Sequence, residues 1–202
     1  MKLNLCAGGC NKEGFINVDK NAETRPDLLL DIVKDKWPYE DNSVDEVWLM
    51  HGLEHIYRKK WDFLFMETKR VLKLNGRFVL GYPEFQICLQ NYLDNKGNRK
   101  DFWLQTIYGR RMWEGDEHVT AVESIELQQI LESYGFYRVK YSTEEGEDYN
   151  SLMVAFKSPE LITREAILAT EMGLPGVAKS MGEVLNDPSR LTGKITEPLQ
   201  QS

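Results

Sequence analysis

Strand-like and helical stretches alternate from the N-terminus to about residue 157, and this alternation limits the fold more than any other feature of the sequence. Apolar or alternating stretches predict strands at residues 3–6, 15–18, 28–30, 44–50, 77–82, 137–141 and 152–156. Helical spacing of apolar residues predicts one helix at residues 61–73 and another from Ser124, as its capping residue, to Gly135. Repeated strand–crossover–strand units favour an α/β fold with a mainly parallel sheet. Ligands of such sheets bind outside the carboxyl ends of the strands, so the residues that follow the strands are the functional candidates.

The composition changes after Phe156, because no aromatic residue, histidine or cysteine follows it. We therefore predict a core domain over residues 1–157 and a separate tail over residues 158–202. Helical spacing within the tail predicts two short helices that pack on the domain or on a neighbouring subunit. A tail that is disordered after Pro188 is the alternative. An apolar helical face without an aromatic core of its own needs a surface to cover, so we expect a homo-oligomer that associates through the tail.

The charge and the cysteine content of the chain limit the binding partners and the cellular location that we expect. The 202-residue chain has a formal net charge of −7, which repels a phosphate backbone, so no nucleic-acid partner is expected. No apolar run approaches the roughly 20 residues that cross a membrane, and no signal peptide is visible at the start. Cys6, Cys10 and Cys88 fit no disulfide framework, which predicts a cytoplasmic protein. No metal is expected, since Cys6 and Cys10 have no second pair of ligands nearby.

Small residues follow the first predicted strand, at Cys6, Ala7 and Gly8. Such residues let a ligand approach the backbone closely, although a tight turn uses glycine equally well. The spacing does not match G-x-G-x-x-G, and the next strand begins too soon for a full helix whose N-terminus could hold a pyrophosphate. The turn therefore argues against a nicotinamide dinucleotide.

Carboxylates follow the second and third predicted strands, at Asp19 and Asp31. The two oxygens of Asp19 suit the paired hydroxyls of a ribose, although a turn or helix-cap aspartate would look the same. Asp31 suits an exocyclic adenine amine, while Ile32 can pack on the ring. After the fourth strand, Gly52 allows a cofactor to come close to the backbone.

Taken in order, these segments resemble the class I S-adenosylmethionine-dependent methyltransferases of the short, type 11-like kind. The resemblance covers residues 3–157 and is carried by residues 4–8, 14–19, 30–32, 37–45, 51–56 and 70–77. Its most specific stretches are Pro-Tyr-Glu-Asp-Asn-Ser-Val-Asp at 38–45 and Arg-Val-Leu-Lys-Leu-Asn-Gly at 70–76. The resemblance implies a Rossmann-like, doubly wound, mainly parallel sheet of seven strands, the last of them antiparallel.

The resemblance also implies that S-adenosylmethionine is the cofactor and gives each strand end a role. Cys6, Ala7 and Gly8 would contact the methionine part, although the family usually has a glycine in place of Cys6. Asp19 would hold the ribose, with Lys20 beside it, and Asp31 with Ile32 would bind the adenine. His51 and Gly52 would border the methionine and the acceptor.

Methyl transfer from a sulfonium is an in-line displacement, which needs a base only if the acceptor must lose a proton early. His51 and His118 are the catalytic candidates, because imidazole titrates near neutral pH. The alternative is that His118 pins a loop, while Glu54 and His55 cap the start of a helix. Between residues 83 and 122, aromatic and charged residues interleave, which favours a partial lid over an acceptor pocket; a helix that packs on the sheet is the alternative.

A zinc hydrolase must also be considered, because His51-x-x-Glu54-His55 matches an inverted zinc-protease pattern. That chemistry needs both histidines on one helix face and a third ligand, whereas this segment follows a strand. The preferred hypothesis is a methyltransferase that acts on oxygen or nitrogen of a small-molecule acceptor. A catalytically silent, methyltransferase-like scaffold or binding module is the second hypothesis.

Overall fold

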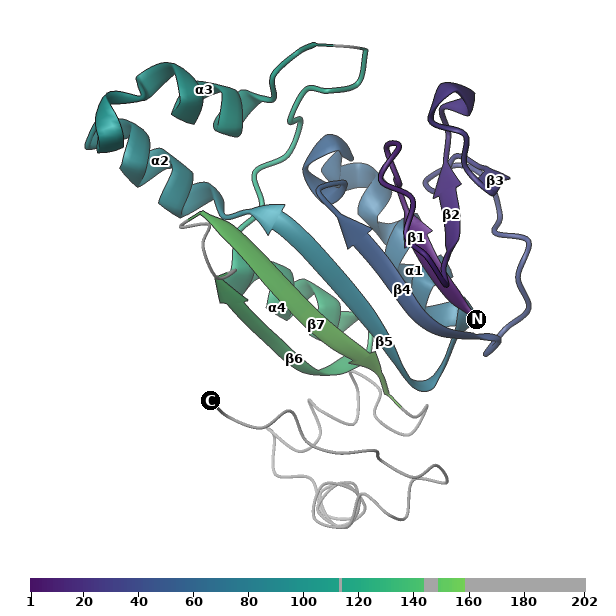
Figure 1. Cartoon of the computed structure of the whole chain (residues 1–202). Helices are drawn as coiled ribbons and strands as arrows, with labels where there is room; N and C mark the ends of the chain where they lie inside the picture. The colour runs from purple at the N-terminus through teal and green to yellow at the C-terminus, as the bar shows by residue number, and fades with distance from the viewer. Residues whose placement is uncertain (113, 144–148, 159–202) are drawn as a thin grey trace, which may run out of the picture. The chain divides into compact units, whose positions relative to one another are not determined.

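The computed structural model describes residues 1–112, 114–143 and 149–158, which form a seven-stranded sheet of order β3-β2-β1-β4-β5-β7-β6 (Figure 1). The strands are β1 (Lys2–Leu5), β2 (Ile16–Asp19), β3 (Leu28–Leu29), β4 (Val44–Met50), β5 (Leu72–Pro83), β6 (Phe136–Thr143) and β7 (Asn150–Lys157). The first five strands pair in parallel, and β7 is antiparallel to both β5 and β6. This arrangement confirms the predicted fold class. The predicted tail helices and their self-association lie outside the described residues.

The strand order reverses at β1: β2 and β3 extend the sheet on one side of it, and β4 and β5 extend it on the other. The connections among the first four strands contain the short 3-10 helix η1 (Ala22–Thr24) and no α-helix, as the spacing after β1 predicted. Open α/β sheets bind ligands outside the carboxyl ends of the strands at such a reversal point, which here lies at β1 and β4.

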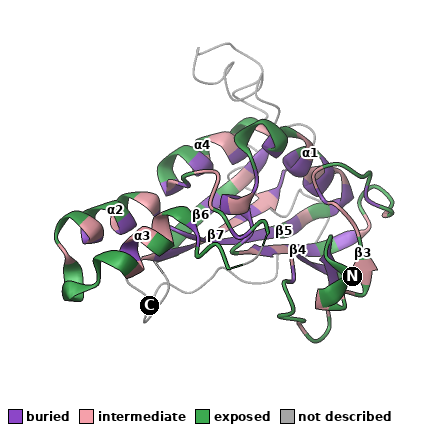
Figure 2. Ribbon diagram, turned by 90° about the horizontal axis from the view of Figure 1, so that it is seen from above, coloured by how far each residue is buried: buried purple, intermediate pink, exposed green. Residues whose placement is uncertain are grey.

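Two helices pack on one face of the sheet, α1 (Trp61–Val71) and α4 (Ser124–Ser133), as Figures 1 and 2 show. Their apolar sides are buried, and the ring of Phe65 on α1 lies 6.1 Å from that of Phe78 on β5. The ring of Phe78 in turn lies 5.8 Å from that of Phe136 on β6. These aromatic contacts join α1 to the sheet, and Leu127 and Leu131 of α4 belong to the same hydrophobic core.

Two further helices lie beyond the carboxyl end of β5, α2 (Phe85–Leu93) and α3 (Lys100–Tyr108), with the 3-10 turn η4 (Lys96–Asn98) between them (Figure 1). On α3, Phe102 and Trp103 pack against Tyr149, with ring centroids 5.7 and 5.5 Å away. The segment between β5 and α4 therefore contains a pair of helices at the edge where the parallel strands have their carboxyl ends. None of the helices in the described residues is both long and apolar enough to cross a membrane.

The start of α4 differs from the prediction. Ser124 does not cap the helix with its own side chain; it is the first helical residue, after Glu123. The carboxylate of Glu84, which is buried at the end of β5, accepts hydrogen bonds from both the backbone N–H and the hydroxyl of Ser124. A carboxylate from another element thus satisfies the helix N-terminus. The first long helix ends at Val71 rather than residue 73, because Leu72 already begins β5.

Arg70 joins the two most specific stretches of the resemblance, residues 38–45 and 70–76. Its guanidinium donates to the carboxylates of Glu67 and Asp41 and to the carbonyls of Trp37 and Tyr39. Glu67 also accepts from the backbone N–H of Trp37, whose side chain is 1% exposed. These stretches therefore hold the end of α1 to the segment before β4, and their role is structural.

Candidate active site

The turn after β1 is tied to the end of β2. The backbone N–H of Ala7 donates to the Val18 carbonyl at 3.1 Å, and that of Gly8 donates to Asp19 Oδ2 at 2.8 Å. Cys6 has a left-handed backbone with φ of 51°. That region favours glycine, which gives a physical reason for the glycine that the family usually has there.

Asp19 ends β2 and is 9% exposed. Its Oδ1 accepts from the backbone N–H of Asn21 at 2.8 Å, in addition to the bond from Gly8 to Oδ2. The turn-stabilising role that the sequence left open is therefore real. Each carboxylate oxygen has a second acceptor position, so these bonds leave Asp19 able to accept from a ligand as well.

Asp31 is joined to the same edge, since the backbone N–H of the preceding Leu30 donates to the Asp19 carbonyl at 2.9 Å. Its Oδ1 accepts from the backbone N–H of Val33 at 3.2 Å. Ile32 is 5% exposed and belongs to the hydrophobic core, where its carbonyl accepts from Trp37 Nε1.

Several charged side chains lie near the thiol of Cys6. Burial raises the pKa of this thiol to about 12, and the negative charges of Asp19, Glu54 and Asp31 contribute in the same direction, whereas Lys20 lowers it. These three carboxylates therefore lie in the neighbourhood of the turn after β1.

The ends of β1 and β4 meet at Gly52. A Cβ added there would lie 3.2 Å from Cys6 Cβ and 2.5 Å from Leu49 Cδ1, so the close approach favours glycine. The preceding His51 is left-handed, with φ of 50°, and its N–H donates to the Gly81 carbonyl. Non-glycine residues in this region are uncommon and gather at functional sites.

The loop between α3 and α4 brings His118 to the same edge. The backbone carbonyl of Glu54 accepts from Val119 N at 2.9 Å and from Thr120 N at 3.1 Å. As a result, the rings of His55 and His118 lie 4.8 Å apart, edge to face. Across the loop, a Cβ added to Gly115 would lie 3.9 Å from Lys20 Nζ, so the loop also reaches the end of β2.

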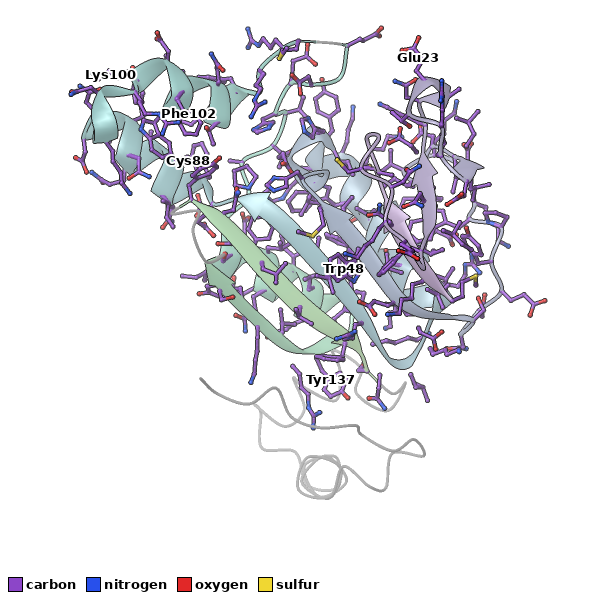
Figure 3. The ribbon with its side chains drawn as sticks, in the orientation of Figure 1. Glu23, Trp48, Cys88, Lys100, Phe102 and Tyr137 are labelled. Carbon is purple, nitrogen blue, oxygen red and sulfur yellow. The ribbon has the colours of Figure 1, made fainter. Side chains whose placement is uncertain are left out.

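A cavity of about 330 Å³ opens between this edge and α3. His51 and His118 both line it, together with Glu54, His55, Phe102 and Asn150; Figure 3 shows Phe102 among the side chains of α2 and α3. Burial lowers the pKa of His118, which favours neutral imidazole. Phe102 is one of the aromatic residues that the sequence favoured as a wall of an acceptor pocket. Sequence reasoning missed Asn150, because it comes from β7 and carries no local signal.

The zinc-protease pattern is not formed. Leu53–His55 is a 3-10 turn, η2, and His51 precedes it in a left-handed conformation, so the two histidines do not share a helix face. The histidine next to His55 is instead His118, from a distant part of the chain.

Comparison with known proteins supports the fold and the class. Residues 9–80 match the family model described as "Methyltransferase domain". A comparison with curated proteins returns no significant match. Among solved structures, S-adenosylmethionine-dependent methyltransferases from Archaeoglobus fulgidus and Methanosarcina mazei each align with a TM-score of 0.56 and 17% identity, over 77% and 79% of this chain and 85% and 92% of theirs. One from Thermotoga maritima, described as a possible histamine N-methyltransferase, aligns with a TM-score of 0.56 and 14% identity, over 78% and 82%.

Residues 9–80 therefore match a methyltransferase domain, and the sheet order with its antiparallel β7 is the fold of the solved S-adenosylmethionine-dependent methyltransferases. A methyltransferase domain on this fold implies methyl transfer with S-adenosylmethionine as the cofactor.

Proposed function

We propose that this methyltransferase acts on an oxygen or nitrogen atom of a small-molecule acceptor that binds in the cavity beside His51. The position of His51 carries this proposal. It directly follows β4, at the edge formed by the carboxyl ends of the strands, and it also lines the cavity. A cavity of about 330 Å³ is at the lower end of the size of small-molecule sites, which suits a small acceptor. The histamine that names the Thermotoga maritima protein is an acceptor of that size.

The cofactor side is proposed to use the strand-end residues. Asp19 with Lys20 would hold the ribose, Asp31 with Ile32 the adenine, and Cys6, Ala7, Gly8, His51 and Gly52 the methionine part. The turn after β1 fits such a group, because a Cβ added to Gly9 would meet no atom within 4 Å and one added to Gly8 would meet only the Cys6 carbonyl, at 3.7 Å. S-adenosylmethionine supplies an electrophilic methyl group, and the chain supplies position and charge.

Proton removal from the acceptor is proposed to fall to His51. Its side chain is 47% exposed, and its Nδ1 lies 3.5 Å from Oε1 of Glu54, which is buried. The carboxylate of Glu54 would help to orient the imidazole toward the acceptor. His118 is proposed to contact the acceptor from the inner wall of the cavity.

Calorimetric titration with S-adenosylhomocysteine tests the cofactor side. Asp19→Ala is expected to weaken binding about 100-fold or more, because it removes charge-assisted bonds to two hydroxyls that contribute about 1.5–3 kcal/mol each. Asp94→Ala on the exposed surface is the matched control and is expected to bind normally. The absence of binding to the native protein at millimolar ligand would end the proposal.

Mass-spectrometric detection of S-adenosylhomocysteine, produced with a panel of hydroxylated and amine acceptors, tests turnover. His51→Gln is expected to lower kcat about 100-fold or more while it leaves cofactor affinity unchanged. Cofactor binding without turnover on any acceptor would favour the silent scaffold, for which the replacement of the usual glycine by Cys6 is the motive.

The organisation of the chain stays a prediction. We propose residues 1–157 as the methyltransferase domain and residues 158–202 as a packing or oligomerisation extension, which light scattering of the chain with and without residues 159–202 would test. The three cysteines are free thiols, which accords with a reducing, cytoplasmic location.

A further inference from the structure

We infer that Glu54, His55 and His118 form a site for one divalent transition-metal ion of the zinc class, in the wall of the acceptor cavity. One carboxylate oxygen and one nitrogen from each ring all lie within 4.8 Å of one another. The three residues line the same cavity. This inference departs from the expectation that the chain binds no metal, and it requires neither cofactor nor acceptor.

Glu54 provides the first reason for a cation. The residue is 2% exposed, and its Oε2 is buried without a hydrogen-bond partner among the described residues. Its other oxygen lies 3.5 Å from His51 Nδ1, which is beyond a strong ion pair. A buried carboxylate that lacks full compensation is costly, and a dication in the cluster would supply the missing charge.

The hydrogen bonds of the two histidines provide the second reason. His55 Nδ1 lies 3.0 Å from the Glu117 carbonyl, so this nitrogen must carry the proton. His118 also has a hydrogen bond with the backbone of Thr106, in which the ring nitrogen of His118 is the donor. Each neutral ring then keeps one nitrogen lone pair for a ligand. Metal-binding histidines generally donate their other N–H in this way, often to a backbone carbonyl.

The donor set indicates the kind of metal. Two imidazoles and one carboxylate suit zinc, cobalt or nickel, whereas magnesium and calcium prefer oxygen ligands alone. Three protein ligands are also typical of sites that leave a position open to a substrate or water. Because the cluster borders the cavity, an acceptor oxygen would be able to take that position. The contact of His118 with the acceptor would then pass through the metal.

Titration of the chelator-treated full chain tests the inference, with zinc followed by calorimetry and cobalt by visible absorption. One ion per chain is expected. His55→Gln and His118→Gln are each expected to weaken binding at least about 100-fold, since loss of a group that only orients a ligand already costs about 10- to 100-fold.

Two controls separate this site from other binding. Cys10→Ser removes the exposed thiol, and His51→Gln removes the remaining histidine of the chain. Both are expected to bind metal within about threefold of the native protein, a margin of about 0.7 kcal/mol that a residue outside the ligand set would not exceed. Circular dichroism melts confirm that each variant is folded.

Proton NMR of the cobalt-loaded native protein tests the ligands without any substitution. Two shifted, exchangeable imidazole N–H signals are expected, one for each ring. Substoichiometric binding, binding that survives both His→Gln variants, loss of binding in either control, or a spectrum without two imidazole signals would overturn the inference. Titration with S-adenosylhomocysteine is a separate measurement, so failure here leaves the proposed methyl transfer to be judged alone.

Discussion

Gly109 allows the loop between α3 and α4, which carries His118, to adopt its folded conformation. It has φ of 81° and ψ of 158°, a region that is essentially restricted to glycine. A Cβ added there would lie 2.9 Å from the His118 nitrogen and nearer still to the Asp116 carbonyl oxygen. The same nitrogen donates to the Tyr108 carbonyl at 3.0 Å, so the added atom falls where the two ends of the loop meet.

Gly109→Ala is therefore expected to destabilise the closed loop by about 1–3 kcal/mol, the usual cost of such a conformation. The open population should then rise roughly five- to 150-fold. Arg110 and Arg111 are exposed trypsin sites in this loop. Their cleavage rate, measured by mass spectrometry under conditions in which reclosing is faster than cleavage, should rise by the same factor.

Gly115→Ala is the matched control. Gly115 also has a positive φ, of 90°, but its nearest outside atom is Lys20 Nζ at 3.9 Å, so substitution there adds strain without a clash. It should accelerate cleavage less than Gly109→Ala does. Equal cleavage of Gly109→Ala and native protein would refute the reasoning, because the loop would then close without the glycine.

Three further predictions concern stability and reactivity. Arg70→Ala should lower the free energy of unfolding by about 2–4 kcal/mol in urea, and Arg70→Lys should restore less than half, because lysine cannot reproduce the planar fork; full recovery with lysine would contradict the network. In the presence of a metal chelator, the free energy of unfolding should fall as the pH drops below the unfolded histidine pKa of 6.5. The reason is that the pKa of His118 is lowered in the folded protein, so the unfolded chain binds more protons. If His118→Gln leaves the slope of unfolding free energy against pH unchanged, the explanation is wrong. Iodoacetamide at pH 8 should modify the exposed Cys10 well before Cys6 and Cys88, because burial raises the pKa values of those two thiols to about 12. The rate at each cysteine is measured by digestion and mass spectrometry, and equal rates at all three would contradict the burial of Cys6 and Cys88.

Much of the fold was predictable from local pattern. Six of the seven strands lie within about two residues of their predicted positions, because apolar alternation and turn residues are local signals. The exception is β5, which begins at Leu72, five residues before the predicted start. The candidates at Cys6, Asp19 and His51 follow from the same logic, since parallel strands bring their carboxyl ends to one edge. Ser124 shows the limit. A serine at a helix start predicts a cap, but the acceptor that satisfies the helix comes from Glu84, 40 residues away.

Sequence alone determined the class of fold and the residues at the strand ends, because the spacing of apolar residues, the turn residues and the order of the elements are local features of the chain. Tertiary structure decided which of those residues share a site. His55 meets the loop of His118 across 62 positions, through a bond to Glu117, and only the pairing of that loop with the Glu54 carbonyl brings them together. Such long-range contacts depend on the closure of the whole chain, and neither histidine carries a local sign of its partner.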